Sequence, residues 1–269
     1  MADSLSGDSS VFTSDDDPEL VKEAMPFALK TFESLLTSTP EHEGLLLSAA
    51  QGFISYAYLL QQEADLIDDE DYKKAKHLRK RASKLFLRGR DFAFRGLNLK
   101  NENFKDKLIK NTDETLSKTE KSDIHFLYWS GIGWAGAIAA AKDDTRLIVA
   151  LPYAAALIKH ILEVDESYGE GAVYEFLIAY EAGRPNGNLN LCREYYKKAM
   201  EYSKGKRVSV YLSLAENVSV QEQNTEEFKN LIDSALAINV DDQMNIRLVN
   251  TISQKRAKWL KENITKLFL

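Results

Sequence analysis

The chain has 269 residues, of which 44% are hydrophobic and 28% charged, and these shares exclude wholesale disorder. Only 13 Gly and 5 Pro argue against an all-β protein with many tight turns. A single cysteine, Cys192, excludes an internal disulfide framework and a cysteine-based zinc site. The net charge of −6 argues against a general polyanion-binding protein, so we expect no nucleic-acid partner.

The acidity is concentrated at the start of the chain. Residues 1–20 contain six acidic residues and no Lys or Arg, which equals the whole net charge. Residues 1–16, rich in Ser, Asp and Gly, predict a flexible acidic N-terminal tether, and residues 17–269 predict a single all-α domain. The first residues lack the basic and apolar regions of a secretory leader, so the chain is either cytoplasmic or a protein whose leader has been removed.

Hydrophobic spacing of three and four residues predicts about ten helices and no strands. The first helix starts at Asp17-Pro18-Glu19, where an Asp cap, a Pro in the first turn and an acidic residue come together, and it ends before Pro40. The polar segment 100–120 predicts a loop with a short helix. The other helices are expected at about 43–64, 72–96, 123–142, 144–163, 168–183, 188–203, 208–218, 224–238 and 243–267.

A cationic run and a weak repeat stand out along this helical pattern. Residues 73–90 contain nine Lys or Arg and no acidic residue, which is typical of either a solvated face or a partner-binding face. An apolar-x-apolar pattern at helix ends recurs from Leu97 at steps of 65, 38 and 36 residues. The last two steps lie near the ~34-residue tetratricopeptide (TPR) period. Together with small residues at Ala199 and Ala235, this spacing favours a TPR-like helical repeat or superhelical bundle.

The motifs typical of enzymes fail in their context. Residues 131–136 match G-x-G-x-x-G, but helical spacing runs through the glycines and no acidic residue follows at 150–160, so we expect a tight helix crossing. The acidic runs at 15–16, 68–71 and 143–144 lack the spacing of a magnesium-binding motif, and we interpret them as helix caps. With no paired histidines and no nucleophile motif, we expect no enzyme, metal or cofactor.

Two uncharged stretches and a set of aromatic residues leave alternatives open. Residues 124–141 and 147–158 are interpreted as buried helices, the alternative being a surface that faces lipid or a hydrophobic ligand. Six aromatic residues on three predicted helices are either core or the walls of one hydrophobic ligand cleft. These candidate ligand-binding residues are Tyr56, Tyr58, Trp129, Trp134, Tyr174 and Phe176.

Short matches in order along nearly the whole chain carry a family resemblance. They include the stretches 14–21, 26–30, 44–47, 56–58, 63–65, 95–97, 128–129, 142–144, 151–152, 175–178, 203–206, 215–220, 235–238, 247–250, 254–260 and 267–269. In these stretches the chain resembles the TatT family, the T component of tripartite ATP-independent periplasmic (TRAP) transporters.

The resemblance implies a non-enzymatic TPR-like protein of the periplasm, typically a lipoprotein and a homotrimer with an apolar cleft or pore in each protomer. It implies docking of the transporter's solute-binding P component and handling of a hydrophobic or lipid ligand. Membrane contact would then be made through a lipid anchor absent from the given sequence, with the acidic start as its tether. The alternatives are a generic TPR scaffold for protein–protein interaction and, less favoured by the failed motifs, an all-α metal-dependent enzyme.

Overall fold

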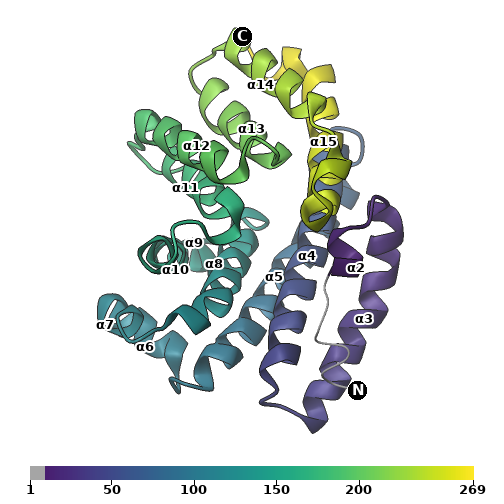
Figure 1. Ribbon diagram of the computed structural model, residues 1–269. Coiled ribbons are helices and arrows are strands. Elements are labelled where there is room, and N and C mark those ends of the chain that lie inside the picture. The colour runs from purple at the N-terminus through teal and green to yellow at the C-terminus, as the bar shows by residue number, and fades with distance from the viewer. Residues whose placement is uncertain (1–9) are drawn as a thin grey trace. The chain divides into compact units, whose positions relative to one another are not determined.

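The computed structural model describes residues 10–269, and every regular element within that range is a helix (Figure 1). This confirms the all-α prediction, whereas the TPR-like repeat stays a prediction. The described chain forms two compact units. We call residues 19–165 the N-terminal unit, and residues 10–18 together with 166–269 the C-terminal unit. The single domain predicted over residues 17–269 stays a prediction.

The tether predicted over residues 1–16 also stays a prediction, and its residues 1–9 lie outside the described residues. From residue 10 the chain forms the short helix α2 (Ser10–Thr13) within the C-terminal unit. Arg247 donates a hydrogen bond to the Ser14 carbonyl and forms an ion pair with Asp16 at 2.9 Å. One positive side chain therefore holds part of the acidic start in place.

Long helices form the frame of the N-terminal unit: α3 (Pro18–Ser38), α4 (Glu43–Ile67) and α5 (Tyr72–Asn98). The predicted start of α3 at Pro18 is confirmed. Asp71 caps α5 by accepting a hydrogen bond from the Lys74 amide at 3.0 Å, so the capping interpretation is correct there. Helix α4 packs along α5 through faces rich in Ala and Leu.

Shorter elements complete this unit. They are α6 (Phe104–Lys110), α7 (Thr112–Leu116), η1 (Lys121–Asp123), α8 (Ile124–Ala139), α9 (Thr145–Ile148) and α10 (Leu151–Val164). Helix α8 packs on both α5 and α10. The single helix expected at 144–163 is two helices, with Pro152 in the first turn of α10, where the missing N–H costs nothing.

The glycine motif lies inside α8, not at a strand-to-helix turn. A Cβ atom at Gly131 would lie 2.7 Å from Ile158 of α10, and one at Gly136 would lie 2.6 Å from Phe86 of α5. A Cβ at Gly133 would meet the Phe86 carbonyl oxygen at 3.0 Å. The expectation of a tight helix crossing is therefore confirmed, and the glycines permit close packing on neighbouring helices.

The C-terminal unit continues with η2 (Tyr168–Gly171), α11 (Ala172–Ala182), α12 (Leu189–Ser203), α13 (Val208–Leu214), the π-helical turn η3 (Ala215–Ser219), α14 (Thr225–Ala237), η4 (Val240–Asp242), η5 (Met244–Ile246), α15 (Arg247–Glu262) and η6 (Ile264–Lys266). Consecutive helices pack on each other: α11 on α12, α13 on α14, and α14 on α15. Their shared core contains Phe228, Ile232 and Leu260, all nearly or fully inaccessible to solvent.

Small buried residues permit this packing, as the sequence predicts. Ala199 and Ala235 are fully buried, and the Ala199 carbonyl oxygen would lie 2.6 Å from a Cβ at Gly171. Cys192 is also fully buried, with its Sγ 3.6 Å from the Ile178 carbonyl oxygen, and burial raises the pKa of its thiol. The cysteine is thus a packing residue within this core.

One apolar tract of the N-terminal unit is only partly covered. Among the described residues, Thr145–Val164 has the length and composition of a helix that could cross a membrane, and one third of its window is buried. Ala154, Leu157, Ile158 and Ile161 face inward, because α10 packs on α8. Ile148 and Val149 are 41% and 71% exposed. The tract therefore consists of two helices that bury one face of α10 on α8 and leave an apolar outer surface at the end of α9.

Candidate functional site

The candidate aromatic residues divide between the two units. Helix α4 carries Tyr56 and Tyr58, and α8 carries Trp129 and Trp134, all in the N-terminal unit. Helix α11, in the C-terminal unit, carries Tyr174 and Phe176. A single cleft lined by all of them stays a prediction.

Trp134 is the centre of the aromatic packing in the N-terminal unit and is only 4% exposed. Phe94 from α5 packs edge-to-face with it at a centroid distance of 5.7 Å, and Tyr153 from α10 stacks on it at 6.1 Å. The Arg90 guanidinium lies over the ring at 5.1 Å, and the Lys105 ammonium at 5.7 Å. Cations over an aromatic face are attracted by its quadrupole, so Trp134 ties four elements together.

The other three candidate aromatic residues of this unit differ in exposure. Tyr56 is buried, and its hydroxyl accepts a hydrogen bond from Arg81 Nη2 at 3.1 Å. Tyr58 and Trp129 are half-buried. Trp129 packs against Tyr128 at 5.2 Å in an edge-to-face arrangement. Half-buried rings retain accessible surface, so Tyr58 and Trp129 are better placed than Tyr56 to meet a ligand.

In the C-terminal unit, Tyr174 joins a polar cluster. Its hydroxyl donates a hydrogen bond to Glu166 at 2.6 Å, and its ring stacks on Tyr202 at 5.8 Å with the planes nearly parallel. Tyr195 packs on the same ring at 6.0 Å. Lys198 pairs with Glu166 at 3.2 Å and also lies over the Tyr202 ring. We call these five residues the tyrosine cluster.

Hydrogen bonding sets the charge state of the tyrosine cluster. The Tyr174 hydroxyl, together with the Lys198 ammonium, holds the pKa of Glu166 below its ordinary value, so this carboxylate stays charged. Burial, then the neighbouring Glu166, raises the pKa of Tyr174, so its hydroxyl stays protonated as a donor. The cluster is a fixed carboxylate between a phenol and an ammonium, and its chemistry is that of a structural network.

Phe176 lies two residues after Tyr174 on α11 and is half-buried. Its ring stacks on Tyr180 at 6.1 Å, and the Arg184 guanidinium lies over Tyr180. Phe176 therefore offers part of an aromatic face without any hydrogen-bonding group of its own.

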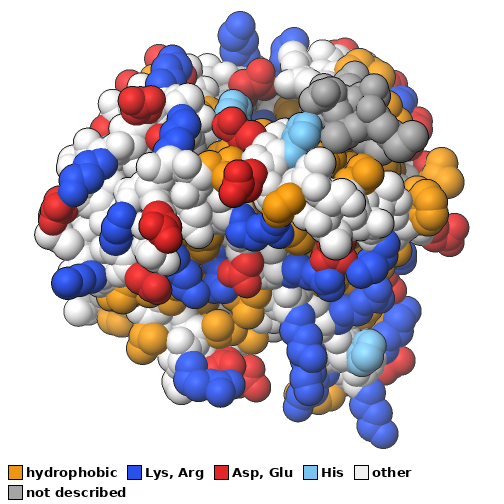
Figure 2. All heavy atoms as spheres, turned by 90° about the horizontal axis from the view of Figure 1, so that it is seen from below, with side chains coloured by type: hydrophobic (Ala, Val, Ile, Leu, Met, Phe, Trp, Pro, Cys, Tyr) orange, Lys and Arg blue, Asp and Glu red, His pale blue; other side chains and the backbone are white. Residues whose placement is uncertain are grey.

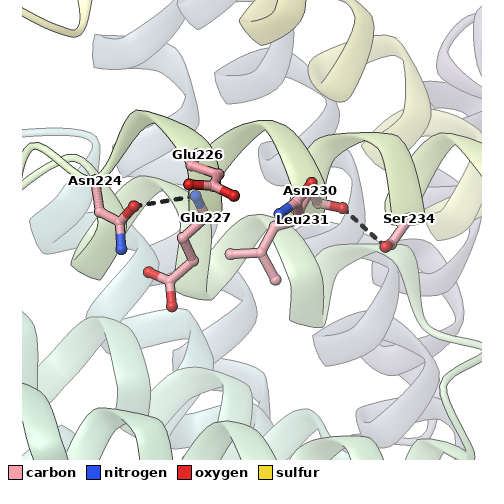
Figure 3. Close-up of a pocket in the computed structure, with 6 residues that line it drawn as sticks. All are labelled: Asn224, Glu226, Glu227, Asn230, Leu231 and Ser234. Atoms are coloured by element: carbon pink, nitrogen blue, oxygen red, sulfur yellow. Dashed lines mark hydrogen bonds between the residues drawn. The ribbon is translucent and has the colours of Figure 1, made fainter.

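A shallow depression of about 350 Å³ lies along α14 (Figure 3). Its lining comes from one helix and its N-cap: Asn224, Glu226, Glu227, Asn230, Leu231 and Ser234. Asn224 accepts a hydrogen bond from the Glu227 amide, and the Ser234 hydroxyl donates to the Asn230 carbonyl. Glu227 forms ion pairs with Arg193 and accepts a hydrogen bond from Ser219. Most of these polar groups are therefore already partnered within the unit.

A second depression, of about 360 Å³, lies between α3 and α5. Lys30, Arg88 and Arg95 stand around it, with Glu33 forming ion pairs to both Lys30 and Arg88. Arg95 donates a hydrogen bond to the Pro40 carbonyl at 2.9 Å. None of the six candidate aromatic residues lines either depression.

With this geometry established, comparison with known proteins decides the family. The family model described as the TRAP transporter T-component matches residues 14–268. The chain belongs to this family. It is therefore an accessory component of a TRAP transporter. The T-component family is not a known enzyme family. Membership implies association with the transporter and a periplasmic or membrane-associated location.

One related protein is similar to this chain over most of the length of both. An uncharacterized protein of Treponema pallidum (strain Nichols) is 28% identical over 267 residues, covering 96% of this chain and 83% of the relative. The similarity thus extends through both units of this T component.

Sequence analysis missed most of the partners of Trp134 and Tyr174 in this T component. Glu166, Lys198 and Tyr202 form the tyrosine cluster with Tyr174, yet they are 8 to 28 residues away in the chain. The signal that was present is the i, i+4 spacing of Lys198 and Tyr202 on one helix face. Arg90 gave no signal, because it sits within a run of cations that indicates a solvated face.

The acidic runs serve local structure, as interpreted. Asp144 accepts a hydrogen bond from the Arg146 amide at the start of α9, and Asp15 accepts one from the Asp17 amide at 2.7 Å. Asp65 and Asp68 both pair with Arg79 of α5. Each run therefore has at least one carboxylate with a partner within the chain, and Asp71 and Asp144 cap helices as interpreted.

Proposed function

We propose that this chain is a non-enzymatic periplasmic T component that docks the solute-binding P component of a TRAP transporter. In this proposal it also passes a hydrophobic ligand through an apolar cleft or pore and acts as a homotrimer held at the membrane by a lipid anchor. The observation that carries the proposal is the family match over residues 14–268, which spans both units.

The partly covered tract at α9 and α10 supports contact with another protein. Ile148 and Val149 are exposed, Pro152 is exposed beside them, and the next turn is apolar. A large exposed apolar patch is typical of an interaction surface. A trimer requires two different patches that meet head to tail around an axis, and this tract is one candidate for such a patch.

The half-buried aromatic residues support contact with an apolar ligand. Tyr58, Trp129 and Phe176 combine a large ring with accessible surface, which is the usual lining of small-molecule sites. Trp134, Tyr56 and Tyr174 are nearly buried, so each would offer a ligand little surface of its own. The ligand class is therefore an apolar molecule that stacks or packs on aromatic faces.

Native mass spectrometry of the purified chain, alone and with the P component of its transporter, tests the proposal. We expect a trimer that carries co-purified lipid and takes up the P component. A monomer that ignores the P component but binds an extended peptide would instead assign the generic helical scaffold. Metal-dependent turnover of a substrate would instead show that the chain is a metal-dependent enzyme.

A matched pair of variants tests the aromatic lining. We expect Trp129→Ala and Phe176→Ala to weaken binding of a fluorescent fatty-acid probe by about 10-fold or more, because each removes a partly exposed ring, and 1.4 kcal/mol corresponds to this factor. Phe27→Ala is the control, since Phe27 is 82% exposed on α3 and outside the set. Equal probe binding by all three variants and the parent chain would remove the ligand part of the proposal.

A further inference from the structure

The outer face of α5 carries a row of exposed positive side chains. Lys73, Lys76, Lys80 and Lys84 recur at steps of three and four residues and are all exposed, with His77 beside them. The opposite face of the helix is buried and includes Ala75, Ala82 and Phe86. We call Lys73, Lys76, Lys80 and Lys84 the lysine row. In Figure 2, Lys and Arg side chains gather at the lower right of the face shown.

The lysine row has no acidic partner among residues 10–269, unlike several other cations of α5. Lys74 pairs with Glu63, Arg79 pairs with Asp65 and Asp68, and Arg88 pairs with Glu33. The Lys76 ammonium lies over the ring of Tyr72, 5.9 Å from its centroid. The paired cations hold α5 against its neighbours, whereas the lysine row presents its charge to the surroundings.

The net negative charge of the chain does not cancel this local charge. The Debye length is about 8 Å at physiological ionic strength, so acidic residues beyond that distance contribute little to the field at the row. From Lys73 to Lys84 the row extends roughly 16 Å along the helix, at about 1.5 Å per residue. The exposed acidic residues 69–71 come just before Lys73 and offset the charge at the start of the row. A surface that meets α5 from Lys76 to Lys84 still encounters several positive charges at once.

The composition of this face distinguishes between kinds of partner. Lysine is depleted from protein–protein interfaces, which are built around buried aromatic or arginine anchors. Only Tyr72, 62% exposed, offers a large apolar group at the start of the row. Anionic bilayers attract lysine near their surface without needing such an anchor, and tyrosine is enriched at the headgroup level.

We propose that the outer face of α5 binds the anionic headgroups of a lipid bilayer through the lysine row. The contact adds a second membrane attachment to any lipid anchor and orients the N-terminal unit on the bilayer. A single acyl chain gives only marginal membrane binding, and a basic patch is a common second signal. The proposal rests on the membrane-associated location that the family implies and not on docking of the P component.

Vesicle co-sedimentation of the purified chain tests the proposal. The vesicles are phosphatidylcholine alone, or phosphatidylcholine with about one third phosphatidylglycerol as the anionic lipid. We expect binding only to the anionic vesicles, and we expect a rise in salt to release the protein, because screening removes the attraction. Equal binding to both vesicle types, or none to either, would overturn the proposal.

Two triple variants locate the contact. Replacing Lys73, Lys80 and Lys84 by Gln should weaken binding to anionic vesicles about 100-fold, at about fivefold per lysine. The control replaces Lys197, Lys229 and Lys258 by Gln. These lysines are exposed on α12, α14 and α15, and replacing them removes the same amount of positive charge. Equal weakening by both triples would show a net-charge effect and overturn the assignment to α5.

Two further measurements keep the test independent of folding and of docking. Circular dichroism of both triples should match the parent chain, and replacing the same α5 residues by Arg should retain vesicle binding, since the charge is kept. Because the vesicles contain no transporter protein, their result stands apart from P-component docking. If the α5 triple loses the P component but keeps the vesicles, the row is a protein-docking surface and the lipid proposal is wrong.

Discussion

The surroundings of Trp134 and of Tyr174 use aromatic residues in two different ways. Trp134 is packed between helices of the N-terminal unit by ring contacts and cations, and glycines of the same helix let the backbones approach. Tyr174, in the C-terminal unit, uses its hydroxyl as much as its ring, because it donates to Glu166 and stacks on Tyr202. Both side chains are about 95% buried, yet one is held by shape and the other by a hydrogen bond as well.

The difference shows that burial alone does not describe what a residue contributes. Loss of the Trp134 ring leaves a cavity between several helices, whose free-energy cost grows with the volume left empty. Loss of the Tyr174 hydroxyl removes one hydrogen bond and leaves the ring packing in place. The two regions should therefore respond very differently to substitution.

The largest expected effect is that of Trp134→Ala, which should lower the free energy of unfolding by about 3–5 kcal/mol. Trp129→Ala, on the same helix but half-buried, should cost less than half as much. Denaturant titration followed by circular dichroism measures both. Similar costs for the two tryptophans would mean that Trp134 is not the packing centre described above.

Gly133→Ala should follow, with a cost of about 1–3 kcal/mol from overpacking. Its Cβ would lie 2.9 Å from Ile54, and 3.0 Å from both the Arg90 Cβ and the Phe86 carbonyl oxygen. Gly183→Ala is the matched control, because the nearest atom would be the Ala179 carbonyl oxygen at 3.2 Å, and the backbone there is helical. Equal thermal unfolding midpoints for the two variants would contradict the tight crossing at α8.

A smaller effect is expected for Tyr174→Phe, which keeps the ring and removes the donor to Glu166. Loss of this hydrogen bond should cost about 0.5–1.5 kcal/mol. The pKa of Glu166, which Tyr174 and Lys198 hold below its ordinary value, should rise toward that value in the variant. An NMR titration of the Glu166 carboxylate measures this change. An unchanged pKa would show that the hydrogen bond from Tyr174 does not lower it.

The smallest effect concerns pH and Glu227 of α14. The hydrogen bonds from Arg193 hold the pKa of Glu227 below its ordinary value of 4.5, so its ion pair stabilises the folded state above that pH. This stability is lost as the pH falls through the lowered pKa. Glu227→Gln should therefore flatten the decline of the unfolding free energy below pH 4.5. If the variant's unfolding free energy declines as steeply as that of the parent chain, the decline comes from other carboxylates.

Helix positions were predictable because they depend on local residues. Spacing and caps located α3, α4, α5, α12 and α14 to within a few residues. The break between α9 and α10 was missed, because Leu147 to Ile158 keeps an apolar pattern on both sides of Pro152. The C-terminal helix was expected at about 243–267 but covers Arg247–Glu262, flanked by single 3₁₀ turns.

The candidate site was predictable only as a set of residue types. Aromatic residues at helical spacing identified Trp134 and Tyr174, but the pattern contained no information on which of them had a polar partner. The Glu166 partner of Tyr174 lies in the turn before α11, and the Tyr202 ring comes from α12. Such contacts depend on how helices pack, which a single sequence specifies only through the sum of many weak preferences.

The central claim is that this member of the T-component family docks a solute-binding protein. Sedimentation velocity of a fluorescently labelled P component from the same transporter, titrated with the unlabelled chain, tests it most directly. The account predicts a faster-sedimenting species that saturates at one defined stoichiometry per trimer. A P component whose sedimentation stays unchanged up to saturating concentrations of a folded, trimeric chain would contradict it.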